Sequence, residues 1–251
     1  MKNTIKLLLA SASIGILAAC GGGGGTTEQI IPPTLDLRTA WANYFQQNSS
    51  SNYTISGSVN GANVGGNGTM IVAYTSPVSV LAIDPSSPFP GPSINLSNIS
   101  KTSLVSNATL IVNNQSTLSA STSEYYFDSN GVLKMIKDVN DDEQTIVTSF
   151  TNFPIQVTAG TAGTLYAGTI FSRLGYTCGT ETGVYSVAGE SNTALIVTIT
   201  FTQNTTNRTV GQCETQTSTS QNKYRLTANG LSPVESVGSL STATGSIKLT
   251  F

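Results

Sequence analysis

Residues 195–202 read Leu-Ile-Val-Thr-Ile-Thr-Phe-Thr, with large apolar side chains at every second position. Leu195, Val197, Ile199 and Phe201 fall on one face, while threonine fills most of the other face. A period of two is typical of an antiparallel strand that buries one face and exposes the other to water. Threonine and β-branched apolar residues also favour strands. This stretch therefore predicts a half-buried strand, and it sets the pattern to look for elsewhere.

The same period recurs along most of the chain. It is clearest at Tyr53, Ile55 and Val59, at Met70, Val72 and Tyr74, and at Ile247, Leu249 and Phe251. Further candidate strands are 103–113, 117–128, 131–138, 144–151, 164–172, 182–188, 208–217 and 221–228. Turn residues separate them at 60–61, 65–68, 113–114, 130–131, 189–190 and 229–230. The pattern predicts an all-β, mainly antiparallel protein of about a dozen strands, arranged as a curled sheet, half-barrel, barrel or sandwich.

Residues 34–47 form the one convincing helical pattern. Leu37, Ala40, Trp41, Tyr44 and Phe45 recur at helical spacing and make an apolar stripe. We expect Thr34 to cap this helix and Asp36 to lie in its first turn, where the helix dipole favours a negative charge. The stripe either packs on the sheet or covers a ligand cavity. In the second case Trp41, Tyr44 and Phe45 are the ligand-facing candidates.

Two stretches interrupt the strand pattern. Residues 84–100 are rich in proline, which removes donors from a β-ladder, and predict a long surface loop or an edge. Residues 153–163 hold Pro154 and two glycines. Either stretch could divide two sheets, although one all-β domain can use a chain of this length.

The N-terminus has the order of an export signal. Lys2 and Lys6 precede an apolar run from Leu7 to Leu17, which is shorter than the roughly 20 residues that a membrane-spanning helix needs. Leu17-Ala18-Ala19-Cys20 follows, and it resembles the lipobox of bacterial lipoproteins. The resemblance implies cleavage before Cys20, attachment of diacylglycerol to its sulfur and acylation of its new amine. Gly21, in place of an aspartate, implies export to the outer membrane.

This resemblance divides the chain into a signal peptide at 1–19, a lipidated Gly/Pro tether at 20–33 and a folded domain at 34–251. Several acyl chains make a stable membrane anchor. The whole chain has 11 basic and 13 acidic side chains, and removing Lys2 and Lys6 leaves 9 against 13, a net charge of −4. We expect the anchored domain to stand beside the membrane, facing either the periplasm or the cell exterior.

The other two cysteines are Cys178 and Cys213. Because an exported protein meets an oxidising compartment, this even pair predicts a structural disulfide bond. A thiolate metal site would need further ligands, and the chain has no histidine.

Asp138, Asn140 and Asp142 have the one-three-five spacing of a calcium-binding loop. The glycine of that loop is replaced by Glu143, and the twelfth position is Ser149 rather than glutamate. The competing interpretation is a polar hairpin turn between two strands. Calcium is thus a weak candidate, and we expect neither a resident metal nor another cofactor.

The amino-acid composition argues against several classes of function. A chain without histidine has no imidazole base or metal ligand, and a net charge of −2 without a basic block argues against nucleic acid as a partner. No motif nominates catalytic residues. We expect a non-enzymatic binding or structural module of the cell envelope, whose ligand is a lipid, a glycan or an envelope protein. The alternatives are an envelope hydrolase that uses two carboxylates, or an outer-membrane β-barrel.

Overall fold

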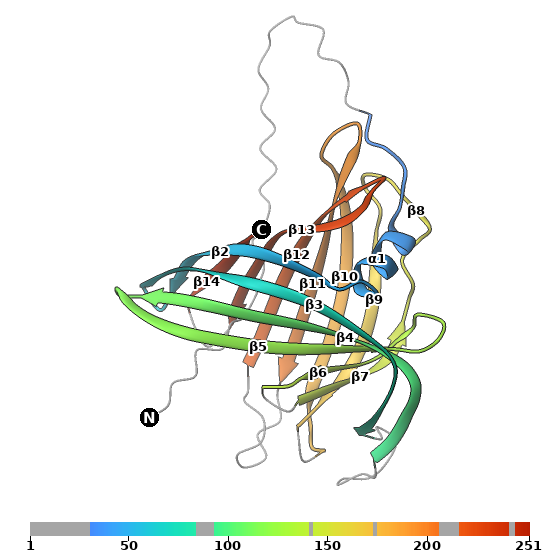
Figure 1. Ribbon diagram of the computed structural model, residues 1–251, viewed down its shortest axis with the longest axis horizontal. Coiled ribbons are helices and arrows are strands. Elements are labelled where there is room, and N and C mark those ends of the chain that lie inside the picture. The colour runs from blue at the N-terminus through green and yellow to red at the C-terminus, as the bar shows by residue number, and fades with distance from the viewer. Residues whose placement is uncertain (1–30, 84–92, 141–142, 173–174, 206–215, 241–243) are drawn as a thin grey trace, which may run out of the picture.

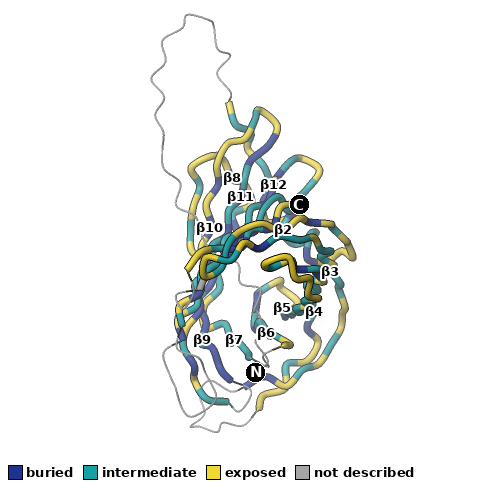
Figure 2. The backbone as a smooth tube through the Cα atoms, turned by 90° about the vertical axis from the view of Figure 1, so that its left-hand side faces the viewer, coloured by how far each residue is buried: buried dark blue, intermediate teal, exposed yellow. Residues whose placement is uncertain are grey.

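Twelve strands close into a single antiparallel barrel in the computed structural model. The structure describes residues 31–83, 93–140, 143–172, 175–205, 216–240 and 244–251. Around the ring the order is β10-β11-β12-β13-β14-β2-β3-β4-β5-β6-β7-β9 (Figures 1 and 2). The predicted all-β class is confirmed. The two interruptions connect strands that are neighbours in the barrel, and Gln156–Val157 in the second of them pair with Leu35–Asp36 in a separate two-stranded sheet.

The barrel strands, in chain order, are β2 (Ser49–Val59), β3 (Ala62–Ile83), β4 (Ser93–Val112), β5 (Gln115–Phe127), β6 (Leu133–Asp138), β7 (Glu143–Phe150), β9 (Ala162–Phe171), β10 (Thr177–Gly189), β11 (Ala194–Thr205), β12 (Gln216–Thr227), β13 (Gly230–Leu240) and β14 (Gly245–Thr250). Most neighbours along the chain are hairpin partners. The ring closes where β14 pairs with β2, with Gly245 opposite Val59 and Ser246 opposite Ser58. Nearly two hundred residues separate these partners, so the closure is the least local pairing in the barrel.

Some expected boundaries are wrong. The expected turn Gly65-Gly66-Asn67-Gly68 instead lies within the first part of the long strand β3, and residues 93–100, expected in a loop, begin β4. The sequence pattern missed β13, while most of the predicted strand 208–217 lies outside the described residues. The far ends of β3 and β4 curve past β6 and β7 (Figure 1) and cover a small outer cluster that includes Ile99, Tyr126 and Met135.

The two faces of the barrel wall differ in chemistry. In β11, Leu195, Val197 and Ile199 are fully buried on the inner face. Their neighbours Thr198, Thr200 and Thr202 point outward, and across the ladder Thr202 pairs with Thr182 and Thr219. The same alternation holds in β2, where Tyr53 and Ile55 are buried while Asn52 and Thr54 are exposed. The wall therefore has an apolar inner face and an outer face rich in serine, threonine and asparagine.

Helix α1 (Leu37–Phe45) begins two residues later than expected. Asp36 rather than Thr34 is its N-cap, because the Asp36 carboxylate accepts a hydrogen bond from the backbone N–H of Thr39 at 2.9 Å. The short strand β1 (Leu35–Asp36) pairs with β8 (Gln156–Val157) just before the helix. The Arg38 Nε also donates to the Phe153 carbonyl oxygen at 2.7 Å. These contacts attach the start of the helix to the chain between β7 and β9.

The helix reaches across the barrel. Trp41 meets Tyr224 of β12 with ring centroids 5.6 Å apart, and Phe45 meets Tyr125 of β5 at 5.5 Å. Five strands separate β12 from β5 in either direction around the ring, so these tyrosines lie on opposite walls. The Thr102 hydroxyl of β4 donates to the Phe45 carbonyl oxygen at 2.6 Å and holds the end of the helix. The helix plugs the barrel with its apolar face, while Arg38, Thr39 and Asn43 on its other face are exposed. No helix among the described residues is long and apolar enough to cross a membrane.

Candidate functional site

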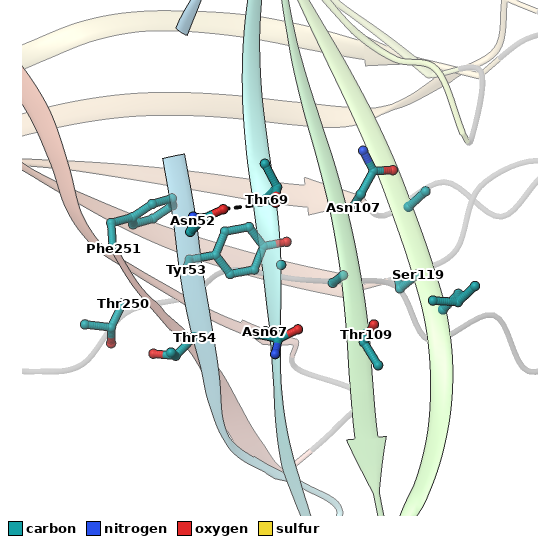
Figure 3. Close-up of a pocket in the computed structure, with 14 residues that line it drawn as sticks. Asn52, Tyr53, Thr54, Asn67, Thr69, Asn107, Thr109, Ser119, Thr250 and Phe251 are labelled. Carbon is teal, nitrogen blue, oxygen red and sulfur yellow. Dashed lines mark hydrogen bonds between the residues drawn. The ribbon is translucent and has the colours of Figure 1, made fainter. Parts of the chain in front are cut away.

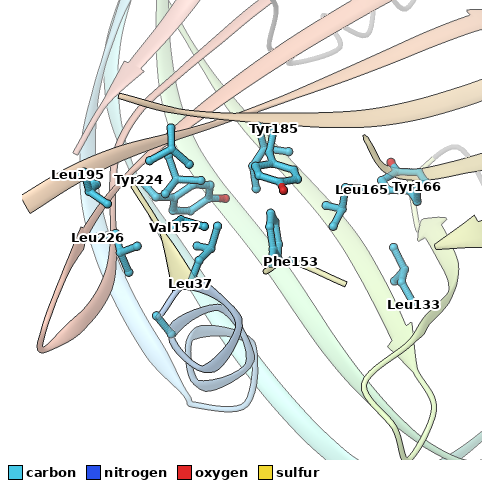
Figure 4. Close-up of a cluster of buried hydrophobic side chains, with 14 residues drawn as sticks. Leu37, Leu133, Phe153, Val157, Leu165, Tyr166, Tyr185, Leu195, Tyr224 and Leu226 are labelled. Atoms are coloured by element: carbon cyan, nitrogen blue, oxygen red, sulfur yellow. The ribbon is translucent and has the colours of Figure 1, made fainter. Parts of the chain in front are cut away.

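The expected ligand-facing side chains Trp41, Tyr44 and Phe45 pack into an aromatic cluster. Trp41 lies 5.0 Å from Phe153 and 4.6 Å from Phe45, measured between ring centroids. Tyr44 lies 5.6 Å from Tyr224. Figure 4 shows Leu37 directed from the helix toward Tyr224 and Phe153. The helix stripe thus packs on the inner wall of the barrel, where its aromatic side chains serve the core.

A buried polar cluster crosses four neighbouring strands of the inner wall. Glu181 of β10 is 5% exposed and accepts hydrogen bonds from the Tyr166 hydroxyl at 2.5 Å and the Thr145 hydroxyl at 2.6 Å. Gln203 of β11 donates a third. Burial raises the pKa of Glu181, although these three hydrogen bonds partly offset that effect. Because both carboxylate oxygens are engaged, the cluster serves packing rather than offering a free acid or base.

A pocket of about 1040 Å³ lies elsewhere, on the wall formed by β2, β3, β4, β5 and the end of β14, and Trp41, Tyr44 and Phe45 line no part of it. Tyr53, Gly68, Ala108 and Ser119 stand opposite one another on these strands and give the pocket its central row. Tyr53 and Ala108 are buried on the inner face, so this row presents its backbone to the outside. The pocket is therefore a groove in the outer face that runs across the strands.

Two rows of outward side chains border this outer groove, and Figure 3 shows most of them. Strand register places Asn52 opposite Thr69, Thr69 opposite Asn107, and Asn107 opposite Ala120. The second row runs from Thr54 through Asn67 and Thr109 to Leu118. Thr250 at the end of β14 also lines the groove and lies near Thr54 in Figure 3. Leu118 is 83% exposed and closes one end with an apolar surface.

The hydrogen-bonding groups of the outer groove are largely unused. The Thr69 hydroxyl donates to the Asn52 side-chain oxygen at 3.2 Å. The side chains of Thr54, Asn67, Asn107 and Thr109 make no hydrogen bond to the described part of the chain. Exposed amides and hydroxyls on a rigid wall are available to a ligand. Sequence reasoning placed Thr54, Asn107 and Thr109 in strands and Asn67 in a turn, and it could not bring them together because their convergence depends on strand register.

The groove is built on a wall whose packing leaves little freedom. The Tyr53 ring lies over Gly68, and its hydroxyl is hydrogen-bonded to the Ser106 hydroxyl at 2.5 Å. Burial raises the pKa of Tyr53, with a smaller opposing effect from Ser106. On the same inner face Ile55, Leu110 and Leu249 complete an apolar cluster. This packing holds the outer side chains at fixed separations.

The acidic loop is a hairpin turn in the part that can be described. Asp138 ends β6, and its carboxylate accepts a hydrogen bond from the backbone N–H of Asn140 at 2.9 Å. The Asn140 side chain accepts from the Thr122 N–H at 2.8 Å and donates to the Ala120 carbonyl. Asp142 lies outside the described residues. Within the described part of the chain, no group of three potential ligand residues could hold a metal ion.

Cys178 is fully buried on β10 against Ile170. The next residue, Gly179, pairs with Thr205 at the end of β11, and Thr205 pairs with Gln216 at the start of β12. Cys213 and Cys20 lie outside the described residues, so the disulfide bond and the lipid anchor stay predictions. The register does bring both ends of the segment that holds Cys213 beside Cys178.

No protein-family model, curated protein or solved structure matches this chain. The function has to be inferred from the barrel and from the outer groove.

Proposed function

We propose that this protein is a lipid-anchored, non-enzymatic binding module of the cell envelope, and that the outer groove is its ligand site. The observation that carries the proposal is the set of unused amide and hydroxyl groups on a rigid wall. Such groups can pair with a ligand without breaking contacts inside the protein. A preformed site also loses little conformational freedom on binding.

The polar outer face supports a barrel that stands in water. A membrane-spanning barrel turns a continuous apolar band, bordered by aromatic residues, toward the lipid. Here the outward residues include Lys223 and Arg225 on β12, and Lys223 is paired with Glu235 of β13 at 2.8 Å. Anchorage through Cys20, as the lipobox implies, would hold such a barrel at the membrane while keeping the groove in solvent. We favour this arrangement over an outer-membrane barrel.

The groove does not favour a carboxylate-based hydrolase. None of the residues that line it has an acidic side chain. Glu181 lies on the inner wall with both of its oxygens hydrogen-bonded. Hydrolysis of a glycosidic bond by the usual route requires two carboxyl groups that face each other across the substrate.

Site-directed thiol labelling tests whether the groove binds envelope material. Thr109→Cys places a thiol in the groove, and the matched control Thr200→Cys places one on the outer face of β11. Full-chain protein carrying either variant is treated with a maleimide dye, with and without a detergent-solubilised envelope fraction. We expect the fraction to slow labelling at position 109 several-fold and to leave position 200 unchanged. If the fraction did not slow labelling at position 109, or slowed it equally at both positions, the proposal would be overturned.

A further inference from the structure

We infer that the ligand of the outer groove is a neutral glycan chain. This inference rests on the proposed function and adds the chemical class of the ligand. The groove crosses β14, β2, β3, β4 and β5, so it suits an extended ligand that lies across the strands. Adjacent strands are about 4.8 Å apart, which sets the spacing of successive side chains along each row.

The charge of the groove argues for a neutral ligand. None of its 14 lining residues has a charged side chain. On the same outer face, Lys101 is paired with Glu124 at 2.8 Å, and Lys248 is paired with Glu235. A phosphate or a carboxylate bound among these side chains would lose water without gaining an opposite charge, which is costly. A ligand without charge avoids this cost.

The side-chain chemistry matches hydroxyl groups. Asn67 and Asn107 each offer an amide that donates and accepts, while the Thr54 and Thr109 hydroxyls can do either. A sugar hydroxyl also donates and accepts, so each of these side chains can pair with a sugar hydroxyl in more than one orientation. Leu118, 83% exposed at one end, offers an apolar surface to the C–H face of a sugar ring. The groove thus provides both kinds of surface that a glycan presents.

Two other ligand classes fit less well. A peptide usually binds a sheet by adding a strand to a free edge. The groove instead runs across β2, β3, β4 and β5, whereas an added strand would lie along the start of β5, where β6 does not pair. A lipid chain would cover the asparagine and threonine side chains of the two rows without offering them hydrogen bonds, which is costly.

Calorimetric titration of the full-chain protein tests the inference. The probes are neutral oligosaccharides (cellohexaose, maltohexaose and chitohexaose) and an acidic one, hexagalacturonic acid. We expect at least one neutral probe to bind. Its affinity should change less than about twofold between low and high salt, because salt screens interactions between charges and a neutral probe has no charge. The variant Asn67→Ala/Asn107→Ala should bind about tenfold more weakly, which corresponds to two lost neutral hydrogen bonds. Asn63→Ala is the matched control, since Asn63 is an exposed outward asparagine of β3 that does not line the groove.

The outcomes separate the glycan inference from the proposed function. Protection of Thr109→Cys by the envelope fraction, combined with no binding of any neutral probe, would overturn the glycan inference and leave the binding site in place. Preferential binding of the acidic probe, or equal weakening by Asn63→Ala, would also overturn it. Absence of protection at position 109 would remove the proposed site itself.

Discussion

Gly68 shows how a single residue fixes the wall beneath the groove. A Cβ atom at this position would meet the Tyr53 ring at 2.4 Å and the Asn107 carbonyl oxygen at 2.6 Å. Tyr53 is buried and hydrogen-bonded to Ser106, so the ring cannot simply move away. The glycine is thus required by the close approach of a side chain and not by a turn.

We predict that Gly68→Ala lowers the free energy of unfolding by about 1–3 kcal/mol, the usual cost of overpacking. Gly65→Ala is the matched control on the same strand, because its Cβ would find its nearest neighbour, the Ile55 carbonyl oxygen, at 3.8 Å. It should leave stability unchanged or raise it slightly. Thermal unfolding of both variants checks the difference, and similar melting temperatures would mean that Tyr53 does not occupy the space above Gly68.

Glu181 gives a prediction about pH. Burial raises the pKa of Glu181, so the folded protein keeps this proton at pH values where the unfolded chain has lost it. The contribution of Glu181 to stability is therefore fully present below the ordinary glutamate value of 4.5 and declines as pH rises through the folded pKa. Glu181→Gln should remove this decline and match or exceed the wild type in stability at pH 8.

Glu181→Leu separates charge from hydrogen bonding. It leaves the Thr145 and Tyr166 hydroxyls without their acceptor in a buried site, which costs about 1–3 kcal/mol. Denaturant titrations of the wild type and both variants at pH 5 and pH 8 measure these effects. The measured quantity is the free energy of unfolding of the wild type minus that of Glu181→Gln. If this difference were larger at pH 8 than at pH 5, the raised pKa of Glu181 would be contradicted.

At the scale of elements, alternation predicted the strands that bury one face cleanly, such as β11, and apolar residues at helical spacing predicted the helix. It missed β13, where glycine, serine and Pro233 obscure the period. It also misread residues 65–68, because glycines that permit close packing inside β3 resemble glycines of a turn. The outer groove could not be predicted, since its rows join residues that only strand register brings together.

The helix plug should unfold together with the barrel. Trp41 is the only tryptophan of the chain and lies in the aromatic cluster between the walls, so its fluorescence reports on the plug. We predict that Trp41 fluorescence and far-UV circular dichroism give coincident denaturant transitions, as in a two-state protein. Phe45→Ala, which removes contacts with Tyr125 and Phe127, should shift both transitions equally. A fluorescence transition at lower denaturant would show that the plug detaches first.

At the scale of the whole molecule, ring closure and the two faces of the wall determine what the barrel can do. Closure through β14 and β2 joins strands far apart in sequence, so the local pattern predicted the strands but could not choose between barrel, half-barrel and sandwich. The apolar interior is filled from one side by α1, while the outer face carries threonine, asparagine and paired charges. These features support the proposal that the barrel stands in water, and the tether through Cys20 stays a prediction from the lipobox.

Subcellular fractionation of Cys20→Ser tests most directly whether the barrel stands in water on a lipid tether. We predict that the wild type fractionates with membranes and incorporates labelled palmitate, whereas Cys20→Ser loses the label and stays in solution as a folded barrel. Circular dichroism and Trp41 fluorescence of the soluble protein establish that it is folded. A Cys20→Ser protein that is folded and still extracted from membranes only by detergent would contradict this claim, because it would mean that the barrel wall itself lies in the lipid.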